Sequence, residues 1–521
     1  FSQNSQQLKR NLRLIPFFIS LSCFLAIIYD FGFNQNSKQD SYLSWLYQIT
    51  LFVGIASTVA RYLKKQERPP FRVFGFDLFS VIYFTGLLIQ PYLSKLNWNY
   101  LSFLDEAAWL YLALLLVFIR EFSALKINFS RAFFNPAQLF ILSFMGIILM
   151  GAGLLLLPNA TNYPISFLDA LFTSTSAVCV TGLIVVDTAT HFTLFGQSII
   201  LILIQIGGLG IMTIASYFSY FFRGGTSYEN QLMLSDMTSS EKLGEVFHTL
   251  RKIIIVTFSI ELLGALFIFS NIQESMIPSF IDRAYFSVFH SISAFCNAGF
   301  STLTNSLFEV GFRFNYPLQI IVMFLFIIGG LGFPIVFNLY NYVKHLVKDR
   351  FIPFVLKEQR GPQNVPWVVN LNSRIVIITS TILLVVGSTI FFLFEYNNSL
   401  AEHNTFGKIV TAVFSAATPR TAGFNTVDIG SLNFSTIMLI FLLMWVGASP
   451  ASTGGGIKTS TFAIATLNFW SLAQGKDRIE IFRREIAEIS IRRAFAIISL
   501  SLVIIGMGIF SIAILDPEKD L

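Results

Sequence analysis

The segment FLDALFTSTSAVCVTGLIVVD (residues 167–187) occurs in three related versions along this chain. The other two are FIDRAYFSVFHSISAFCNAGFST (280–302) and FGKIVTAVFSAATPRTAGFNTVD (406–428). When the three are aligned on Gly182, Gly299 and Gly423, small residues stand six and five positions before each glycine. The glycines are 117 residues (182 to 299) and 124 residues (299 to 423) apart, which indicates a multiplied structural unit.

Each version predicts a short helix that enters the membrane from outside and returns as extended backbone. Its helical part is about ten to twelve residues, too short to cross a bilayer. Non-helical backbone is tolerated at membrane depth only where it is buried in protein or lines water, and glycine lets consecutive carbonyls face one side. A simple helix-packing turn is the alternative. Three copies in register favour a ring of carbonyls that replaces the hydration shell of a monovalent cation, with the negative ends of the short helices aimed at it.

The composition of the whole chain fits a membrane protein. Of its 521 residues, 54% are hydrophobic and only 12% are charged, and the mean hydropathy is +0.67. A soluble surface needs far more charge, so most of this chain must face lipid. The net charge of +6 does not indicate a nucleic-acid partner, because the basic residues gather in particular loops. The three cysteines form neither a disulfide framework nor a metal-binding cluster with histidine.

Apolar stretches recur along the chain and predict membrane spans. We place them near 14–31, 44–61, 74–93, 106–120, 137–157, 196–222, 253–271, 316–342, 374–395, 432–473 (broken) and 494–515. The first stretch is too long for a signal peptide and lacks a cleavage site. Lysine and arginine cluster on alternate loops, which the positive-inside rule assigns to the cytoplasm. We therefore expect a cytoplasmic amino terminus in a cell (inner or plasma) membrane.

The last broken span contains GASPASTGGGIKTST (447–461). Its glycines and proline interrupt the helix, and its hydroxyl groups can bond the backbone groups that are freed. This predicts an intramembrane loop that acts as a gate. Lys458 would add a fixed positive charge to the ion path, and an interfacial lysine that reaches towards water is the alternative. The candidate gate residues are Gly447, Ser452, Thr453, Gly454, Gly455, Gly456 and Lys458.

With the motifs SAVCVTGL, SAFCNAGFST, TPRTAGFNT and GASPASTGGGIKTST, residues 132–521 resemble the Trk/Ktr/HKT superfamily of potassium transporters. The resemblance implies an all-α polytopic membrane protein in which helix–pore loop–helix units surround one ion path, and each unit contributes one glycine to a selectivity filter. The implied filter residues are Val180, Thr181, Gly182, Asn297, Ala298, Gly299, Thr421, Ala422 and Gly423. The stretch 447–456 resembles the intramembrane gate loop of that superfamily, which lies just below the filter.

The same resemblance divides the chain into five parts. They are an extension of about four spans (1–131), pore repeats one (132–235), two (236–360) and three (361–485, with the gate loop 447–456), and the first span of a fourth repeat (486–521). Because the fourth repeat stops after one span and the chain begins with Phe1, we expect the numbered sequence to be a piece of a longer one.

Several polar residues near the predicted filter need a role. Asp187 and Asp428 follow their glycines by five residues and are candidates for a vestibule that concentrates cations, or for helix caps. We expect Arg420 to pair with an acid behind the filter. Glu261 lies in the middle of a span, as a bracing partner or an ion ligand, and we favour bracing. We expect His290 to be a packing residue.

The sequence therefore predicts a potassium-selective uptake subunit and not an enzyme, with no tightly bound cofactor and with potassium, or sodium, as the transported ion. A secondary transporter for another solute and a polytopic membrane enzyme are the alternatives. No set of converging metal ligands or acid–base groups supports an enzyme. The resemblance implies lipid contact, a homodimer and a cytoplasmic nucleotide-binding regulatory subunit that contacts basic loops such as 476–493.

Overall fold

The computed structural model describes residues 14–33, 37–63, 71–95, 107–123, 136–210, 246–346, 371–450, 452–476, 478–481, 484–486 and 488–515. Within these ranges the elements are helices, apart from one antiparallel hairpin of β1 (Glu480–Ile481) and β2 (Arg484–Glu485). Six of the described helices are long and apolar enough to cross a membrane. The prediction of an all-α polytopic membrane protein is confirmed.

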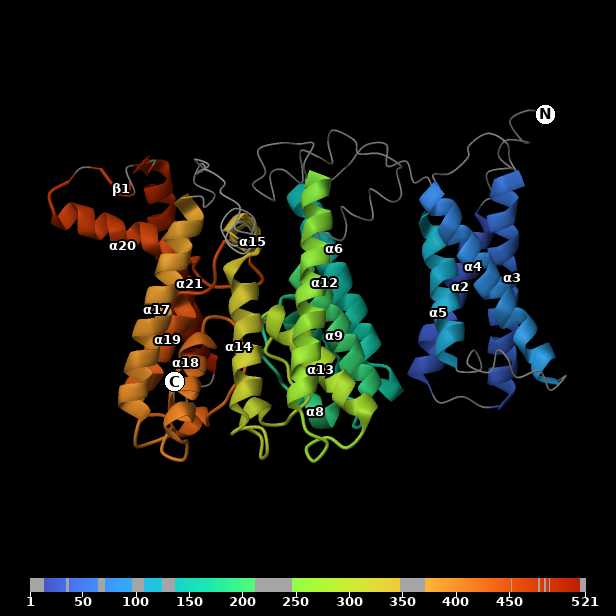
Figure 1. Cartoon of the computed structure of the whole chain (residues 1–521), viewed down its shortest axis with the longest axis horizontal. Coiled ribbons are helices and arrows are strands. Elements are labelled where there is room, and N and C mark those ends of the chain that lie inside the picture. Colours follow the sequence, from blue (N-terminus) through green and yellow to red (C-terminus); the bar gives the residue numbers. More distant parts are fainter. Residues whose placement is uncertain are drawn as a thin grey trace, which may run out of the picture.

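The amino-terminal helices form a bundle of their own, drawn in blue in Figure 1. Its members are α2 (Ile15–Gly32), α3 (Ser37–Leu63), α4 (Phe71–Lys95) and α5 (Ala107–Ser123). Leu51, Phe84 and Leu114 are buried in its core. Asp77 is also buried and accepts two hydrogen bonds from the Arg120 guanidinium, at 2.6 and 2.7 Å. Buried charges in membrane helices are stable when paired in this way.

The rest of the chain repeats one arrangement three times, in which a short helix stands between two longer ones (Figure 1). The first unit is α6 (Pro136–Leu155), α7 (Phe167–Val178) and α9 (Leu194–Leu209); the second is α12 (Val246–Asn271), α13 (Phe280–Phe295) and α14 (Tyr316–Leu331); the third is α17 (Leu371–Glu395), α18 (Thr405–Ala417) and α19 (Phe434–Trp445). A single short turn stands between the short helix and the second long helix of each unit: α8 (Thr188–His191), η4 (Ser306–Phe308) and η6 (Ile429–Ser431). The first unit has another, η2 (Pro158–Ala160), between α6 and α7.

Local sequence explains why the middle helices start where they do. Ser166, Ser279 and Asn404 each accept a hydrogen bond from the backbone N–H three residues later, which caps the helix. The three helices are 12, 16 and 13 residues long. None is long enough to cross a bilayer, although α13 and, by one residue, α18 exceed the expected ten to twelve residues.

One contact recurs between the middle helix and the first long helix of a unit. The Ser174 hydroxyl donates to the Ile148 carbonyl at 2.8 Å, and the Ser291 hydroxyl donates to the Glu261 carbonyl at 2.6 Å. Both serines stand eight positions before the glycine of their own unit. The repeat therefore extends to packing contacts that the glycine alignment did not use.

Two expected spans differ from single continuous helices in the described residues. Within the stretch 196–222, helix α9 ends at Leu209, and residues 211–222 lie outside the described residues. The stretch 316–342 is interrupted at Gly332 (φ 80°), after which α15 (Phe333–Leu346) turns away from α14 (Figure 1). Gly210 has a similar φ of 75°. Glycine adopts this left-handed conformation without a steric cost, so each position can end a helix.

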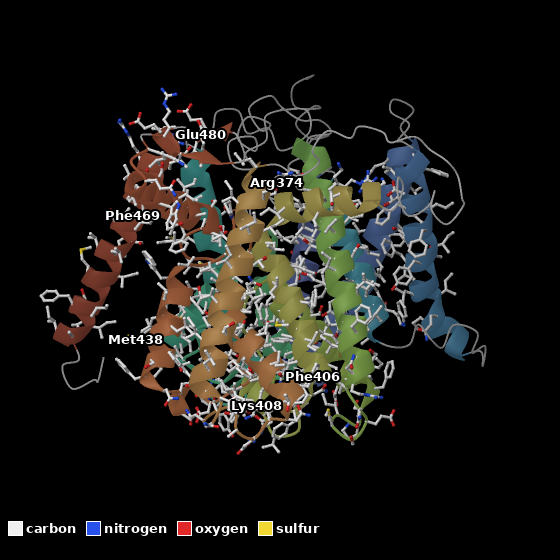
Figure 2. The ribbon with its side chains drawn as sticks, turned by 60° about the vertical axis from the view of Figure 1, so that its left-hand side comes forward. Arg374, Phe406, Lys408, Met438, Phe469 and Glu480 are labelled. Carbon is white, nitrogen blue, oxygen red and sulfur yellow. The ribbon has the colours of Figure 1, made fainter. Side chains whose placement is uncertain are left out.

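After α19 the chain forms an irregular stretch and then α20 (Thr459–Ala473), which lies across the direction of α17 in Figure 1. The predicted interruption of the span 432–473 is therefore present. Helix α21 (Glu488–Leu515) packs on α20 through Phe495 and Phe469, whose ring centroids are 5.8 Å apart. Figure 2 shows Arg374 and Glu480 at one end of the helices and Phe406 and Lys408 at the opposite end.

Candidate functional site

Three short non-helical segments, 180–182, 297–299 and 421–423, follow the middle helices. We call them the strands, and they share one backbone conformation. In each strand the glycine and the residue two positions before it have a positive φ. The pairs are Val180 (55°) with Gly182 (82°), Asn297 (59°) with Gly299 (71°), and Thr421 (83°) with Gly423 (80°). Positive φ is uncommon for residues with a Cβ and unfavourable for β-branched ones. Its recurrence at Val180, Asn297 and Thr421 indicates a backbone conformation that the surrounding structure imposes.

Hydrogen bonds hold each strand to the end of its helix. The Thr181 N–H donates to the Ser176 carbonyl and the Ala298 N–H to the Ser293 carbonyl, both at 2.8 Å. In the third unit the Ala422 N–H donates to Thr418 at 2.9 Å. Hydroxyl groups add bonds across two of the turns: Ser293 Oγ donates to Phe300 O and Thr418 Oγ1 to Phe424 O, each at 2.7 Å.

The three strands meet at their glycines. A Cβ on Gly182 would overlap the carbonyl oxygen of Ala298. A Cβ on Gly299 would lie 2.9 Å from the Cα of Gly423, and one on Gly423 would lie 3.0 Å from the Cα of Gly299. The sequence placed these residues 117 and 124 positions apart, and the fold brings them into contact.

The sequence analysis missed a second set of glycines that makes this arrangement possible. A Cβ on Gly207 would overlap the Val178 carbonyl, and one on Gly329 would overlap the Phe295 carbonyl. Both carbonyls stand four positions before the glycine of their strand. The signal was available in the sequence, because IGGLG occurs at both 206–210 and 328–332.

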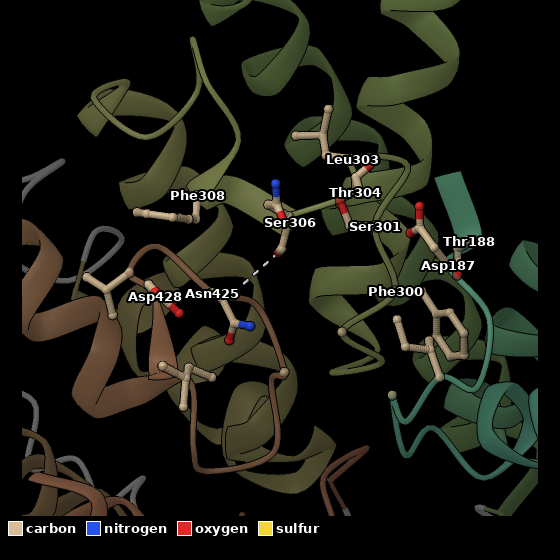
Figure 3. Close-up of a pocket in the computed structure, with 17 residues that line it drawn as sticks. Asp187, Thr188, Phe300, Ser301, Leu303, Thr304, Ser306, Phe308, Asn425 and Asp428 are labelled. Carbon is tan, nitrogen blue, oxygen red and sulfur yellow. Dashed lines mark hydrogen bonds between the residues drawn. The ribbon is translucent and has the colours of Figure 1, made fainter. Parts of the chain in front are cut away.

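A cavity of about 350 Å³ opens directly over the three glycines. Asp187 and Asp428 line it on opposite sides, and Figure 3 shows Ser306 and Asn425 between them. The Asn425 N–H donates to Ser306 Oγ at 3.3 Å. Each acid also caps a short helix: Asp187 accepts from the Ala189 N–H at 3.3 Å, and Asp428 from the Gly430 N–H at 3.0 Å. The helix caps considered for these acids are therefore present, and both acids also line the cavity, while their effect on the local cation concentration stays a prediction.

The irregular stretch after α19 lies against the strands on the side away from the cavity. Ser449 donates to the Gly330 carbonyl through its N–H at 3.0 Å and its hydroxyl at 2.7 Å. A Cβ on Gly454 would overlap Thr421 Oγ1 and lie 3.3 Å from the side-chain amide group of Asn297. Lys458 Nζ donates to the Gly454 carbonyl at 2.6 Å, so this lysine forms a hydrogen bond within the irregular stretch.

Arg420 does not have the partner that we expected. Among the described residues no acid forms an ion pair with it, so that expectation is wrong for this part of the chain. Its guanidinium donates to Ser380 O at 3.4 Å, to Ser380 Oγ at 3.3 Å and to Gly447 O at 3.3 Å. Arg420 therefore links the third strand to the start of the irregular stretch.

The other polar residues behind the strands are buried. His290 hydrogen-bonds Phe286 O and Ser301 Oγ, both at 2.9 Å, which agrees with a packing role. Glu261 is 4% exposed and is bonded by Gln205, in α9. Within the described ranges no group of three histidine, cysteine, aspartate or glutamate side chains is placed to hold a metal ion.

Spans that alternate with re-entrant helices, and glycine turns that meet under one cavity, define a polytopic membrane transport protein and not an enzyme. The chain belongs to the TrkH family of cation transport proteins, whose family model matches residues 116–518.

Curated relatives cover most of this chain. The Ktr system potassium uptake protein B of Bacillus subtilis (strain 168) is 35% identical over 393 residues, which are 74% of this chain and 82% of the relative. The potassium/sodium uptake protein NtpJ of Enterococcus hirae is 32% identical over 393 residues, 74% of this chain and 81% of the relative. The crystal structure of the potassium transporter TrkH from Vibrio parahaemolyticus has a TM-score of 0.55 at 14% identity and covers 91% of this chain and 84% of its own, which supports the fold.

Proposed function

We propose that this chain is the ion-conducting subunit of a potassium uptake system and selects potassium with the backbone carbonyls of the three strands. The single observation that carries the proposal is the shared conformation of 180–182, 297–299 and 421–423 at the floor of one cavity. Carbonyl oxygens in such strands replace the water around a monovalent cation. The helices α7, α13 and α18 end at these strands, so their negative ends favour a cation there.

The residues that we assign to the filter are Val180, Thr181, Gly182, Asn297, Ala298, Gly299, Thr421, Ala422 and Gly423. Asp187 and Asp428 form the vestibule, where two carboxylates on opposite walls raise the local cation concentration. Potassium is the substrate that we favour, because the Bacillus subtilis relative is named as a potassium uptake protein. Sodium is the second candidate, since one relative is named for both ions.

We assign the gate to the stretch 447–456 with Lys458. The contacts with Gly330, Thr421 and Asn297 support a position beneath the filter. A loop in that position limits ion flux without entering the selectivity step.

The proposed organisation has an amino-terminal extension (1–131) and four pore repeats, at 132–235, 236–360, 361–485 and, represented by its first span, 486–521. The serine contacts of α7 and α13 support equivalence of the first two repeats. We place the protein in the cell membrane with its amino terminus in the cytoplasm, since basic residues fall on alternate loops. A homodimer and a cytoplasmic nucleotide-binding regulatory subunit complete the proposed assembly.

The test is uptake of potassium, or rubidium as its tracer, in a host without potassium uptake of its own. We expect saturable uptake that a tenfold excess of sodium inhibits weakly, by about twofold or less for a filter that discriminates by a few kcal/mol. Equal inhibition by both ions would overturn the potassium assignment. Transport of an organic solute without cation uptake would support the secondary-transporter alternative instead.

A further inference from the structure

The three units place different side chains at one equivalent position behind the strands. Gly151 and Gly264 lie against the hydroxyls of Ser174 and Ser291, and the residues three positions earlier are Ile148 and Glu261. The third unit has Gly387 in α17, where an added Cβ would lie 3.4 Å from the Cβ of Ala416 in α18, and Leu384 stands three positions before Gly387. Only the second unit therefore has an ionisable residue at a position that is aliphatic in the other two.

The partner of Glu261 is also polar in one unit only. Gln205 stands two positions before Gly207, and the equivalent residue before Gly329 is Ile327. Gln205 Nε2 donates to both carboxyl oxygens of Glu261, at 3.1 Å each. Two polar residues, on α9 of the first unit and α12 of the second, thus replace an aliphatic pair in the middle of the membrane.

The carboxyl group of Glu261 has no positive partner. Within the described ranges no ion pair includes it, and it faces the Gln205 amide from α9 and the Cys296 thiol from the end of α13, whose Sγ lies 3.8 Å from Oε1. An unpaired carboxylate in an apolar interior is strongly unfavourable and is neutralised by a proton.

The amide opposite the carboxyl group is short of one donor. The oxygen Gln205 Oε1 is buried and has no hydrogen-bond partner among the described residues. A protonated carboxyl group supplies the missing donor: its O–H donates to Gln205 Oε1 while Gln205 Nε2 donates to the other carboxyl oxygen. Such an acid–amide pair satisfies Gln205 Oε1, which an ionised Glu261 would leave without a donor.

We propose that Glu261 is a positioning residue that holds the second filter strand as an uncharged carboxylic acid paired with Gln205. The contact with the strand is made through Cys296, the residue immediately before Asn297-Ala298-Gly299. The pair also joins two units, because Gln205 belongs to the first and Glu261 to the second. This inference rests on the proposed function of these strands as a filter.

The first experiment measures the proton directly. The infrared spectrum of the purified protein should contain the carbonyl stretch of a protonated, hydrogen-bonded carboxyl group, and that band should be absent from the Glu261→Gln variant. A spectrum in which the substitution instead removes a carboxylate band would overturn the proposal. This measurement does not depend on transport, so its outcome is separate from the proposed function.

The second experiment tests positioning with three variants in the uptake assay. Glu261→Gln is the conservative variant, because its amide still donates to and accepts from Gln205, and it should retain the potassium preference. The double variant Glu261→Leu/Gln205→Ile installs the aliphatic pair of the other units, and it should insert normally. We expect its preference for potassium over sodium to fall about fivefold, the effect of one lost hydrogen bond. Ile148→Leu, at the equivalent position of the first unit, is the matched control.

The outcomes separate the two proposals. An unchanged preference in the double variant, with normal insertion, would overturn the positioning role and leave the filter intact. A loss in Glu261→Gln as large as that in the double variant would show that the negative charge is required, which also overturns the inference. An unaltered protein without any preference for potassium would instead refute the proposed function.

Discussion

Single residues at the strands carry most of the chemistry proposed for this protein. Gly182, Gly299 and Gly423 have positive φ and also lie in contact with neighbouring strands, so each is constrained twice. Val180 and Thr421 adopt the same left-handed region although they are β-branched. Conformations of this kind persist only where surrounding contacts fix them.

Substituting any one of the three glycines by serine should weaken potassium selectivity. The left-handed conformation costs a residue with a Cβ about 1–2 kcal/mol, so the apparent KM for potassium uptake should rise roughly tenfold. Gly311→Ser is a matched control, since Gly311 also has positive φ (95°) but has open space around it. Equal effects at Gly311 and in the strands would contradict the filter assignment.

The vestibule acids allow a test of charge alone. Asparagine caps helices as well as aspartate does, so Asp187→Asn with Asp428→Asn removes two charges and keeps the caps. We expect lower uptake at low external potassium and low salt, about two- to fivefold, and little loss at saturating potassium. A loss of the same size at every potassium concentration would indicate damaged folding.

His403, in the connection between α17 and α18, predicts a pH effect on stability. Burial lowers the pKa of its imidazole, and the nearby Arg313 and Lys408 lower it further. The folded protein therefore binds fewer protons at this site than the unfolded chain, whose histidine has a pKa near 6.5. The stabilisation is present above that value and is lost as the pH falls through it.

The measurement is the apparent Tm of the purified protein between pH 7.5 and 5.5 (values chosen about one unit either side of the free histidine pKa). The unaltered protein should lose more on acidification than His403→Gln, which cannot titrate. Identical losses in the two proteins would exclude His403 as the titrating group.

Among the secondary-structure elements, the interruption between α19 and α20 is the least regular part of the proposed ion path. It is held by Ser449 on Gly330, by Arg420 on Gly447 and by Lys458 on Gly454. These contacts tie it to the second and third units.

Deleting Ser452–Gly455 should increase ion flux, because the deletion removes the part of the loop that lies nearest Thr421 and Asn297. Lys458→Ala should act in the same direction but less strongly, since it removes one hydrogen bond worth about 1 kcal/mol. Flux into proteoliposomes, alongside a check of insertion, measures both. Slower flux with normal insertion would assign the loop to packing or ion binding.

At the scale of the whole molecule, the amino-terminal bundle has its own core and touches the pore units at few places. The ring of Phe31 stacks on Phe195 at 5.7 Å, and Asn159 Nδ2 donates to Phe31 O at 3.1 Å. The match to the family begins at residue 116, after most of the bundle. The bundle and the pore units are therefore separable in both packing and family membership.

A variant without residues 1–123 should keep its potassium preference within about twofold, because neither the strands nor the cavity receives a side chain from the bundle. Its thermal stability should fall modestly, since a small apolar contact is lost. The measurement is uptake with sodium competition, corrected for the amount of inserted protein. A changed ion preference would reveal that the bundle acts on the filter.

The sequence alone determined the membrane class, the three re-entrant segments and the glycines at their ends. These features are local: hydropathy depends on composition, and glycine is the residue that accepts a positive φ without a steric cost. The tertiary structure decided which distant residues meet. It placed Arg420 on Gly447 instead of an acid, and Glu261 beside Gln205 and Cys296. Partners of this kind lie 27 to 56 positions apart in the chain, and their choice depends on how whole helices pack and not on any local preference.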